Sequence, residues 1–173
     1  MDALDHFSIP VTGLHNGLHE FDFQVDTGFF QHFEGSPIQV GDANVHLLFD
    51  KRPDLYSMTF QITGTVEVAC DRCLEIFALP IEDTQNLLVK FDETAWEEAD
   101  VIYVTKGIQK LNVSKYIYEF INLAVPMVTT HDDAGERCNP EMLKFLTKEE
   151  DVAEAEEPLN PFKDALRDLN FEN

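Results

Sequence analysis

The feature that most constrains the fold is a long alternation of apolar and polar residues that ends in two closely spaced cysteines. Between residues 56 and 70 the even-numbered positions are mostly apolar, whereas the odd-numbered positions are polar as far as Glu67. A period of two is typical of a β-strand that buries one of its faces. Gly64 interrupts the apolar set, and we expect a bend or a bulge there. The pattern therefore predicts one long strand that leads directly into Cys70 and Cys73.

Cys70 and Cys73 are separated by two residues, a spacing that occurs both in metal sites and in redox enzymes. After them Phe77, Leu79 and Ile81 alternate with polar or small residues, which places the cysteine pair at the tip of a hairpin. A redox Cys-x-x-Cys opens a helix instead, and no helix start follows Cys73. We therefore favour half of a zinc knuckle, in which two thiolates converge on one metal ion.

The second half of the chain could supply the remaining metal ligands, because it holds His131 and the third cysteine, Cys138. Three thiolates and one imidazole form a recognised structural zinc set. The candidate metal ligands are therefore Cys70, Cys73, His131 and Cys138. The two halves lie much further apart in sequence than in familiar zinc fingers, so reduced thiols with a surface histidine are an open alternative. Four protein ligands would close the coordination sphere and staple the C-terminal loop onto the hairpin.

The net charge restricts the class of partner. The 173 residues include 33 Asp and Glu against 12 Lys and Arg, which gives a formal net charge of −21 at pH 7. A negative surface repels phosphate backbones, so direct binding to naked nucleic acid is not expected. The same charge attracts basic proteins, although it could equally serve only to keep the chain in solution.

Nothing at the start of the sequence resembles a secretory signal, because residues 1–5 are acidic and no basic segment leads into an apolar stretch. No run of about 18 apolar residues exists, so we expect no membrane span. Three cysteines is an odd number for a disulfide framework, and grouped cysteines in a reducing cytoplasm bind metal more often than they pair. We therefore expect a cytoplasmic protein.

The remaining periodicities predict an α+β fold, mainly an antiparallel sheet with one main helix, a Cys-x-x-Cys hairpin and a short C-terminal helix. The acidic segment 92–100 is expected to be a loop or short helix that Trp96 anchors to the core. The main helix begins near Asn112 or Ser114 and ends before Pro126, because its apolar residues recur at helical spacing. Further strands are predicted where apolar and polar residues alternate, around residues 21–25, 45–49, 87–91 and 102–104.

We predict three parts along the chain. Residues 1–146 form the α+β domain with the candidate zinc knuckle. Residues 147–159 form an acidic linker, since they are rich in Glu and Ala and poor in large apolar residues. Residues 160–173 carry the short helix, which Asn160 caps and Pro161 opens, with one apolar face.

Signatures of common enzyme classes are absent from the sequence. It contains no Gly-x-Ser-x-Gly, phosphate-binding loop, dinucleotide fingerprint or His-Glu-x-x-His. A nucleophilic pair of Cys70 and His131 is conceivable, but it would leave the other two cysteines unexplained. Asp132 and Asp133 could support a metal ligand through hydrogen bonds or simply face solvent. We therefore expect a protein that is not an enzyme.

Several stretches resemble the YceD family, the large ribosomal RNA subunit accumulation proteins. The more specific ones are Val68–Leu74, with its two cysteines around Arg72, and Ile117–Pro126, with its Leu-Ala-Val-Pro end. The histidine and cysteine of residues 131–138 follow in the family's order. Residues 13–30 and the Asn-Pro-Phe segment at residues 160–169 match as well, so the resemblance spans nearly the whole chain.

This resemblance implies a non-enzymatic role in the production or accumulation of large-subunit ribosomal RNA. Family genes often neighbour a gene for a large-subunit ribosomal protein, which indicates ribosome assembly. Together with the acidity of the chain, it predicts a ribosome-biogenesis factor whose partner is a basic ribosomal protein or a pre-large-subunit particle. Two hypotheses of other classes stay open: a zinc-stapled protein-interaction adapter unrelated to ribosomes, and a thiol enzyme.

Overall fold

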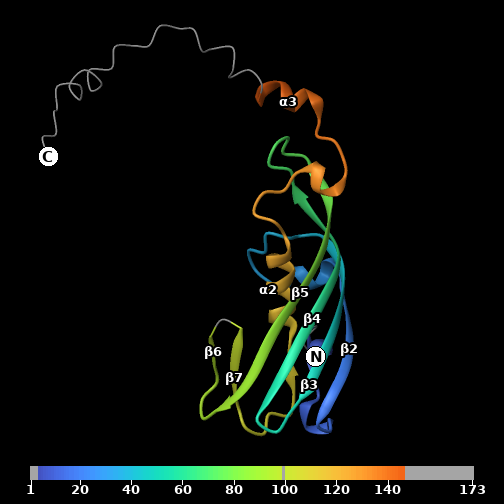
Figure 1. Ribbon diagram of the computed structural model, residues 1–173. Helices are drawn as coiled ribbons and strands as arrows, with labels where there is room; N and C mark the ends of the chain where they lie inside the picture. Colours follow the sequence, from blue (N-terminus) through green and yellow to red (C-terminus); the bar gives the residue numbers. More distant parts are fainter. Residues whose placement is uncertain (1–3, 99, 147–173) are drawn as a thin grey trace, which may run out of the picture. The chain divides into compact units, whose positions relative to one another are not determined.

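A six-stranded sheet forms most of the protein (Figure 1). The computed structural model describes residues 4–98 and 100–146. The chain divides into two units, Met1–Cys138 and Asn139–Asn173, and the whole sheet belongs to the first. Neighbouring strands are antiparallel except for β5 and β7. From one edge to the other the strands are β2 (Gly17–Val25), β3 (Gly41–Lys51), β4 (Leu55–Ala69), β5 (Ile76–Asp92), β7 (Val101–Thr105) and β6 (Trp96–Glu98).

The apolar half of each alternating strand forms the core. On β3 and β4 the alternate side chains from Val45 to Phe49 and from Met58 to Ile62 are fully buried. Helix α2 (Ser114–Ala124) covers this inner face of the sheet and runs beside the long strands (Figure 1). Phe120 of α2 packs against Phe60 of β4, with ring centroids 5.1 Å apart. The alternation read from the sequence is thus the division between a covered and an uncovered face.

Short elements complete the first unit. The N-terminal segment lies on the covered side, where Phe7 packs against Phe23 and Phe29. The second unit contributes one described helix, α3 (Pro140–Leu146). The other short elements are η1 (Asp5–Phe7), β1 (Ser8–Ile9), which pairs with β8 (Leu111–Asn112), η2 (Val11–Gly13), α1 (Thr27–Phe30) and η3 (His131–Ala134).

The start of α2 agrees with the predicted one. Asn112 accepts hydrogen bonds through Oδ1 from the backbone N–H and the hydroxyl of Ser114, at 2.9 and 2.6 Å. A side-chain oxygen at this position satisfies donors that the first turn of a helix leaves free. Asn112 therefore acts as a cap from just outside the helix, while Val113 occupies the formal N-cap position.

The predicted fold class is confirmed, with two differences in the strands. The apolar residues at 77–81 and 87–91 belong to one strand, β5, and not to two. Between them Asp83 and Gln85 stay on the inner side, half-buried and bonded to each other at 2.7 Å. Polar side chains can thus occupy inward positions where they bond to each other near the margin of the core.

The second difference concerns residues 92–100, where a loop or short helix was expected. Trp96–Glu98 form β6, the edge strand beside β7. Trp96 is not buried in the core, because 42% of it is exposed and its ring stacks on Tyr103 at 3.9 Å between centroids. Cross-strand stacking of two aromatic rings favours a strand here despite the acidic sequence.

The predicted division into three parts is only partly within the described residues. The acidic linker of residues 147–159 and the short helix of residues 160–173 lie outside them. Helix α3 was not predicted from the sequence. Among the residues that the structure describes, no helix combines the length and the apolar character needed to cross a membrane.

At Gly64 strand β4 lies unusually close to β3, and it has no bulge there. The register of β4 with β3 and β5 is unbroken at this residue, which pairs with Ala43 and Ile81. A Cβ atom on Gly64 would lie 2.6 Å from Ala43 Cα and closer still to the Asp42 carbonyl oxygen. Both contacts are with backbone atoms, so they cannot be relieved by a side-chain rotation.

We therefore expect Gly64→Ala to lower the free energy of unfolding by about 1–3 kcal/mol, because β3 must shift to accommodate the methyl group. Urea denaturation followed by circular dichroism measures the change. Gly13→Ala is the matched control, since its Cβ would meet no atom within 4 Å. Equal stability of both variants and the wild type would contradict the close approach.

Candidate metal centre

The turn between β4 and β5 brings the thiols of Cys70 and Cys73 close together. Two backbone hydrogen bonds close it, from Cys70 N–H to the Glu75 carbonyl at 2.9 Å and from Leu74 N–H to the Cys70 carbonyl at 2.8 Å. Leu74 has a φ of 62°, in the left-handed region that residues with a Cβ seldom occupy. This backbone reversal directly after the second cysteine allows the chain to turn back into β5.

A second segment is clamped against the base of this turn. Asp71 donates its backbone N–H to the Thr129 carbonyl at 2.8 Å, and its carboxylate accepts the Thr129 N–H at 2.6 Å. The Thr129 hydroxyl donates to the carbonyl of Ala69 at 2.9 Å. These bonds join two parts of the chain that are far apart in sequence, and they deliver the residues after Thr129 to the cysteines.

His131 is fixed by the short helix that it begins. Asp133 accepts hydrogen bonds from the backbone N–H and the hydroxyl of Thr130, at 2.8 and 3.0 Å, so it stabilises the first turn of η3. The imidazole packs on the ring of Phe77, with centroids 4.6 Å apart. Glu136 donates its backbone N–H to the His131 carbonyl at 2.8 Å, which turns the chain towards Cys138.

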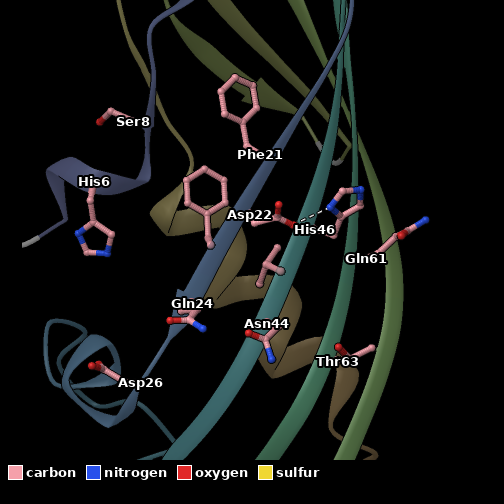
Figure 2. Close-up of a pocket in the computed structure, with 12 residues that line it drawn as sticks. His6, Ser8, Phe21, Asp22, Gln24, Asp26, Asn44, His46, Gln61 and Thr63 are labelled. Carbon is pink, nitrogen blue, oxygen red and sulfur yellow. Dashed lines mark hydrogen bonds and ion pairs between the residues drawn. The ribbon is translucent and has the colours of Figure 1, made fainter.

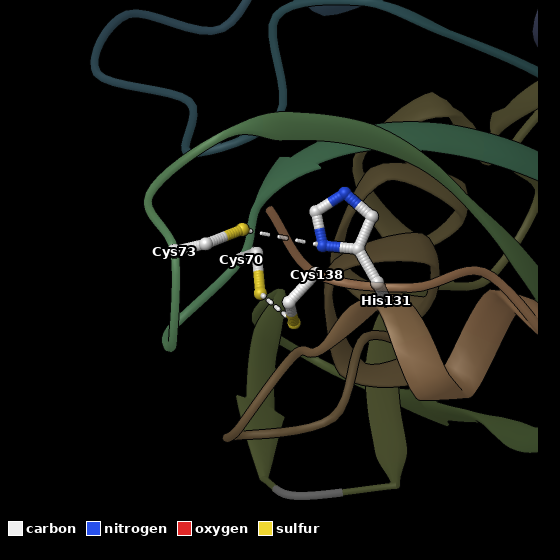
Figure 3. Close-up of side chains that lie close together, drawn as sticks. All are labelled: Cys70, Cys73, His131 and Cys138. Atoms are coloured by element: carbon white, nitrogen blue, oxygen red, sulfur yellow. Dashed lines mark hydrogen bonds between the residues drawn. The ribbon is translucent and has the colours of Figure 1, made fainter. Parts of the chain in front are cut away.

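All four predicted ligands lie in one buried cluster (Figure 3). Cys73 Sγ is 3.5 Å from His131 Nδ1. Cys70 Sγ is 3.7 Å from Cys138 Sγ. All four donor atoms lie within 4.8 Å of one another. This arrangement brings the two halves of the predicted set together.

The cluster has the dimensions of a four-ligand metal site. Metal–sulfur bonds of about 2.3 Å and metal–nitrogen bonds of about 2.1 Å at tetrahedral angles separate two sulfurs by about 3.8 Å and a sulfur from a nitrogen by about 3.6 Å. The two short distances in the cluster are close to these values. The group could therefore hold a metal ion. That it binds a metal ion stays a prediction.

The protein stabilises one thiolate in the cluster. Burial raises the pKa of the Cys70 thiol, but hydrogen bonds from the backbone N–H groups of Cys73 and Arg72 and from His131 lower that pKa to about 6. Burial and the neighbouring Cys70 both raise the pKa of Cys138. A metal ligand must be deprotonated to bind, so the environment of Cys70 favours the form that a metal needs.

The geometry gives little support to a thiol enzyme. Cys70 Sγ is 3.7 Å from Cys138 Sγ, and His131 Nδ1 is 3.5 Å from Cys73 Sγ. All four side chains are buried, so a substrate would have to displace part of the turn. A cavity of about 1060 Å³ lies elsewhere, along β2, β3 and β4, and none of the four residues lines it (Figure 2).

Several residues that position the cluster were not singled out in the sequence. They include Asp71, Thr129 and Phe77, whose contacts are described above. Asp132 and Asp133 were expected to support a ligand or to face solvent. Asp133 caps η3, and the half-exposed Asp132 pairs with Arg72 across the two halves. The sequence does not show which residues the side chains of Asp71 and Asp132 bind, because their partners lie in distant segments of the chain.

Comparison with known proteins identifies one family. A family model described as "Large ribosomal RNA subunit accumulation protein YceD" matches residues 58–170, which is more than half of the chain. All four cluster residues lie inside the matched range. Neither a curated protein nor a solved structure matches the chain significantly.

In the reduced protein stripped of metal, we expect the far-ultraviolet absorbance of thiolate to rise in a step with a midpoint near pH 6. The sign follows from the lowered pKa: Cys70 is a thiolate above this pH and a thiol below it. Cys70→Ala should abolish the step, whereas Cys138→Ala should leave an ionisation in the acidic range. A wild-type protein that titrates only in the ordinary thiol range would contradict this prediction.

Proposed function

The chain belongs to the family of large ribosomal RNA subunit accumulation proteins, YceD, and from this premise we propose that it is a ribosome-biogenesis factor that works by binding and not by catalysis. Its role lies in the accumulation of large-subunit ribosomal RNA, as the family description states. We place this action in the cytoplasm. The partner we propose is a basic ribosomal protein, or a pre-large-subunit particle that carries such proteins.

The observation that carries the choice of partner is the net charge of −21. At neutral pH such a protein is repelled by bare RNA and attracted to lysine- and arginine-rich proteins. An acidic factor could hold a basic ribosomal protein until the RNA is ready to receive it. The accumulation of RNA would then follow from protein delivery, and no direct contact with naked RNA is required.

We further propose that the cluster holds zinc with a structural role. Three sulfur donors and one imidazole nitrogen suit zinc, while harder cations prefer oxygen donors. When bound, the ion would join the β4–β5 turn to the segment that contains His131 and Cys138. All four positions would be occupied by protein atoms, which supports a structural and not a catalytic ion.

Purified protein is therefore expected to contain one zinc ion per chain by elemental analysis. His131→Asn should weaken zinc binding by at least about 100-fold, because losing a ligand should cost more than losing a group that supports one. Competition with a chromophoric chelator measures the affinity. His19→Asn is the matched control, since this histidine lies on β2 outside the cluster.

The two variants separate a metal role from a general effect on folding. Circular dichroism should show the same sheet content in both, because the four cluster residues lie outside β3, β4 and α2. Protein purified without zinc that also fails to bind added zinc would contradict the assignment.

One observation favours a second candidate, a protein-interaction adapter unrelated to ribosomes. Apolar side chains beside the cluster are exposed, among them Leu74 at 72% and Ile76 at 70%. Met127 and Val128, just before the clamped Thr129, are exposed as well. Exposed apolar groups of this kind often mark protein contacts, whatever the partner.

Cosedimentation distinguishes the two candidates. The full-length chain, tagged and expressed at its natural level, should migrate with precursors of the large ribosomal subunit on a sucrose gradient. In binding assays the purified protein should retain basic large-subunit proteins at low salt and release them as the salt concentration rises. Recovery of free ribosomal RNA without protein, or no migration with the precursors, would contradict the proposed function.

A further inference from the structure

One face of the sheet carries no described helix or loop. Side chains that alternate with the buried ones point to this side, which we call the outer face, and most of them are exposed. Helix α2 and the N-terminal segment pack on the opposite side. Strand β4 has 15 residues, so the outer face extends about 50 Å along the strands.

Most side chains in the middle of the outer face are polar and uncharged. The hydroxyl of Thr59 donates to Asn86 Oδ1 at 2.7 Å across β4 and β5, and most of the neighbouring polar groups remain open to solvent. Part of this region lines a cavity of about 1060 Å³, which His6 and Ser8 of the N-terminal segment line as well (Figure 2). The uncharged polar residues of this region are Gln24, Asn44, Ser57, Thr59, Gln61, Thr63, Thr65, Thr84 and Asn86.

Acidic side chains surround this polar region. Lys90 is the single lysine or arginine that the described strands place on the outer face. Of the acids, Asp22 lies 2.7 Å from His46, and Asp50 pairs with Arg52 at 2.8 Å. The acidic residues on this side are Glu20, Asp22, Asp42, Asp50, Glu67, Glu82, Asp92 and Glu98.

An aromatic pair lies at the β6 end of the same face. Trp96 and Tyr103 are directly opposite in the β6–β7 ladder, and their rings stack with centroids 3.9 Å apart and planes 4° from parallel. Trp96 Nε1 donates to Asp92 Oδ2 at 2.9 Å, which fixes the indole. Since 42% of Trp96 is exposed, the indole remains accessible beside Asp92 and Glu98.

We propose that the outer face is a docking surface for an extended polypeptide segment rich in arginine and lysine, and that Trp96 receives one of its cationic side chains. The inference rests on the proposed function, because it identifies the surface that takes the basic partner. Charge complementarity supports it, since the described strands place eight acids and one lysine on this face, and only Asp50 among these acids is paired with an arginine, Arg52. Aromatic rings next to carboxylates bind guanidinium groups through cation–π and ionic contacts.

The same features disfavour single-stranded nucleic acid on this face. An aromatic pair on an open sheet resembles the stacking platforms that bind bases. Such platforms lie in positively charged grooves that follow the phosphates, whereas the outer face is negative. The uncharged polar side chains can instead bond to the backbone of an extended peptide.

The single tryptophan of the chain makes the proposal directly testable, because its fluorescence reports only on the β6 end of this face. The probe is a nona-arginine peptide, which spans about 30 Å when extended. Added to the full-length protein at low salt, it should change the Trp96 emission along a saturable curve. The anisotropy of a labelled peptide measures total binding, wherever it occurs.

A pair of matched triple variants locates the binding site. The outer-face variant combines Glu20→Gln, Glu82→Gln and Glu98→Gln, and it should bind the peptide about tenfold more weakly, because three exposed ion pairs are lost. The control combines Asp5→Asn, Glu34→Gln and Glu119→Gln and removes the same charge. Asp5 and Glu119 lie on η1 and α2, on the covered side, and Glu34 follows Phe33, whose ring stacks on Tyr118 of α2. The affinity of the control should therefore change by no more than about twofold.

Two results would contradict the docking surface but not the proposal of a basic partner. They are peptide binding with no change in Trp96 emission, and equal weakening of peptide binding by both triple variants. A wild-type protein that does not bind the peptide would overturn the surface and the basic partner together. Tighter binding of an oligouridine than of the peptide, with a change in Trp96 emission, would assign the face to RNA instead.

Discussion

The antiparallel pairing of β4 with β5 is the interaction on which the rest of the structure depends. Its register runs without a break from Leu55 opposite Lys90 to Ala69 opposite Ile76. Because side chains alternate along both strands, this register decides which residues face the core. It also brings the turn with Cys70 to the end of a long ladder, where the turn is held by paired backbone and not by the core alone.

The candidate metal centre shows how such a ladder can receive a distant segment. Thr129 makes four hydrogen bonds with the end of β4 and the turn that follows it, three of them with Asp71. This clamp holds His131 beside the cysteines, although the segment that contains His131 forms no hydrophobic core of its own. The four donors are buried and lie within 4.8 Å of one another, so the group could hold a metal ion with all four ligands from the protein.

The two faces of the sheet contribute differently to stability. The inner face holds the apolar side chains and α2, and most of the apolar burial that stabilises the domain lies there. The outer face contributes little to that burial, so its polar and acidic residues can vary without loss of the core. The stack of Trp96 on Tyr103 is stabilised within the sheet and still leaves the indole partly exposed.

The sequence by itself determined β4, the cysteine turn and helix α2, because strand and helix periods are local properties. It offered the four residues of the cluster only as candidates, with reduced thiols and a surface histidine as the alternative. It did not reveal that β5 is continuous through Asp83, or that residues near Trp96 form an edge strand. Those outcomes depend on pairing with strands distant in sequence. Only the tertiary structure decided that His131 meets Cys73, since the clamp at Thr129 joins segments whose contact no local pattern encodes.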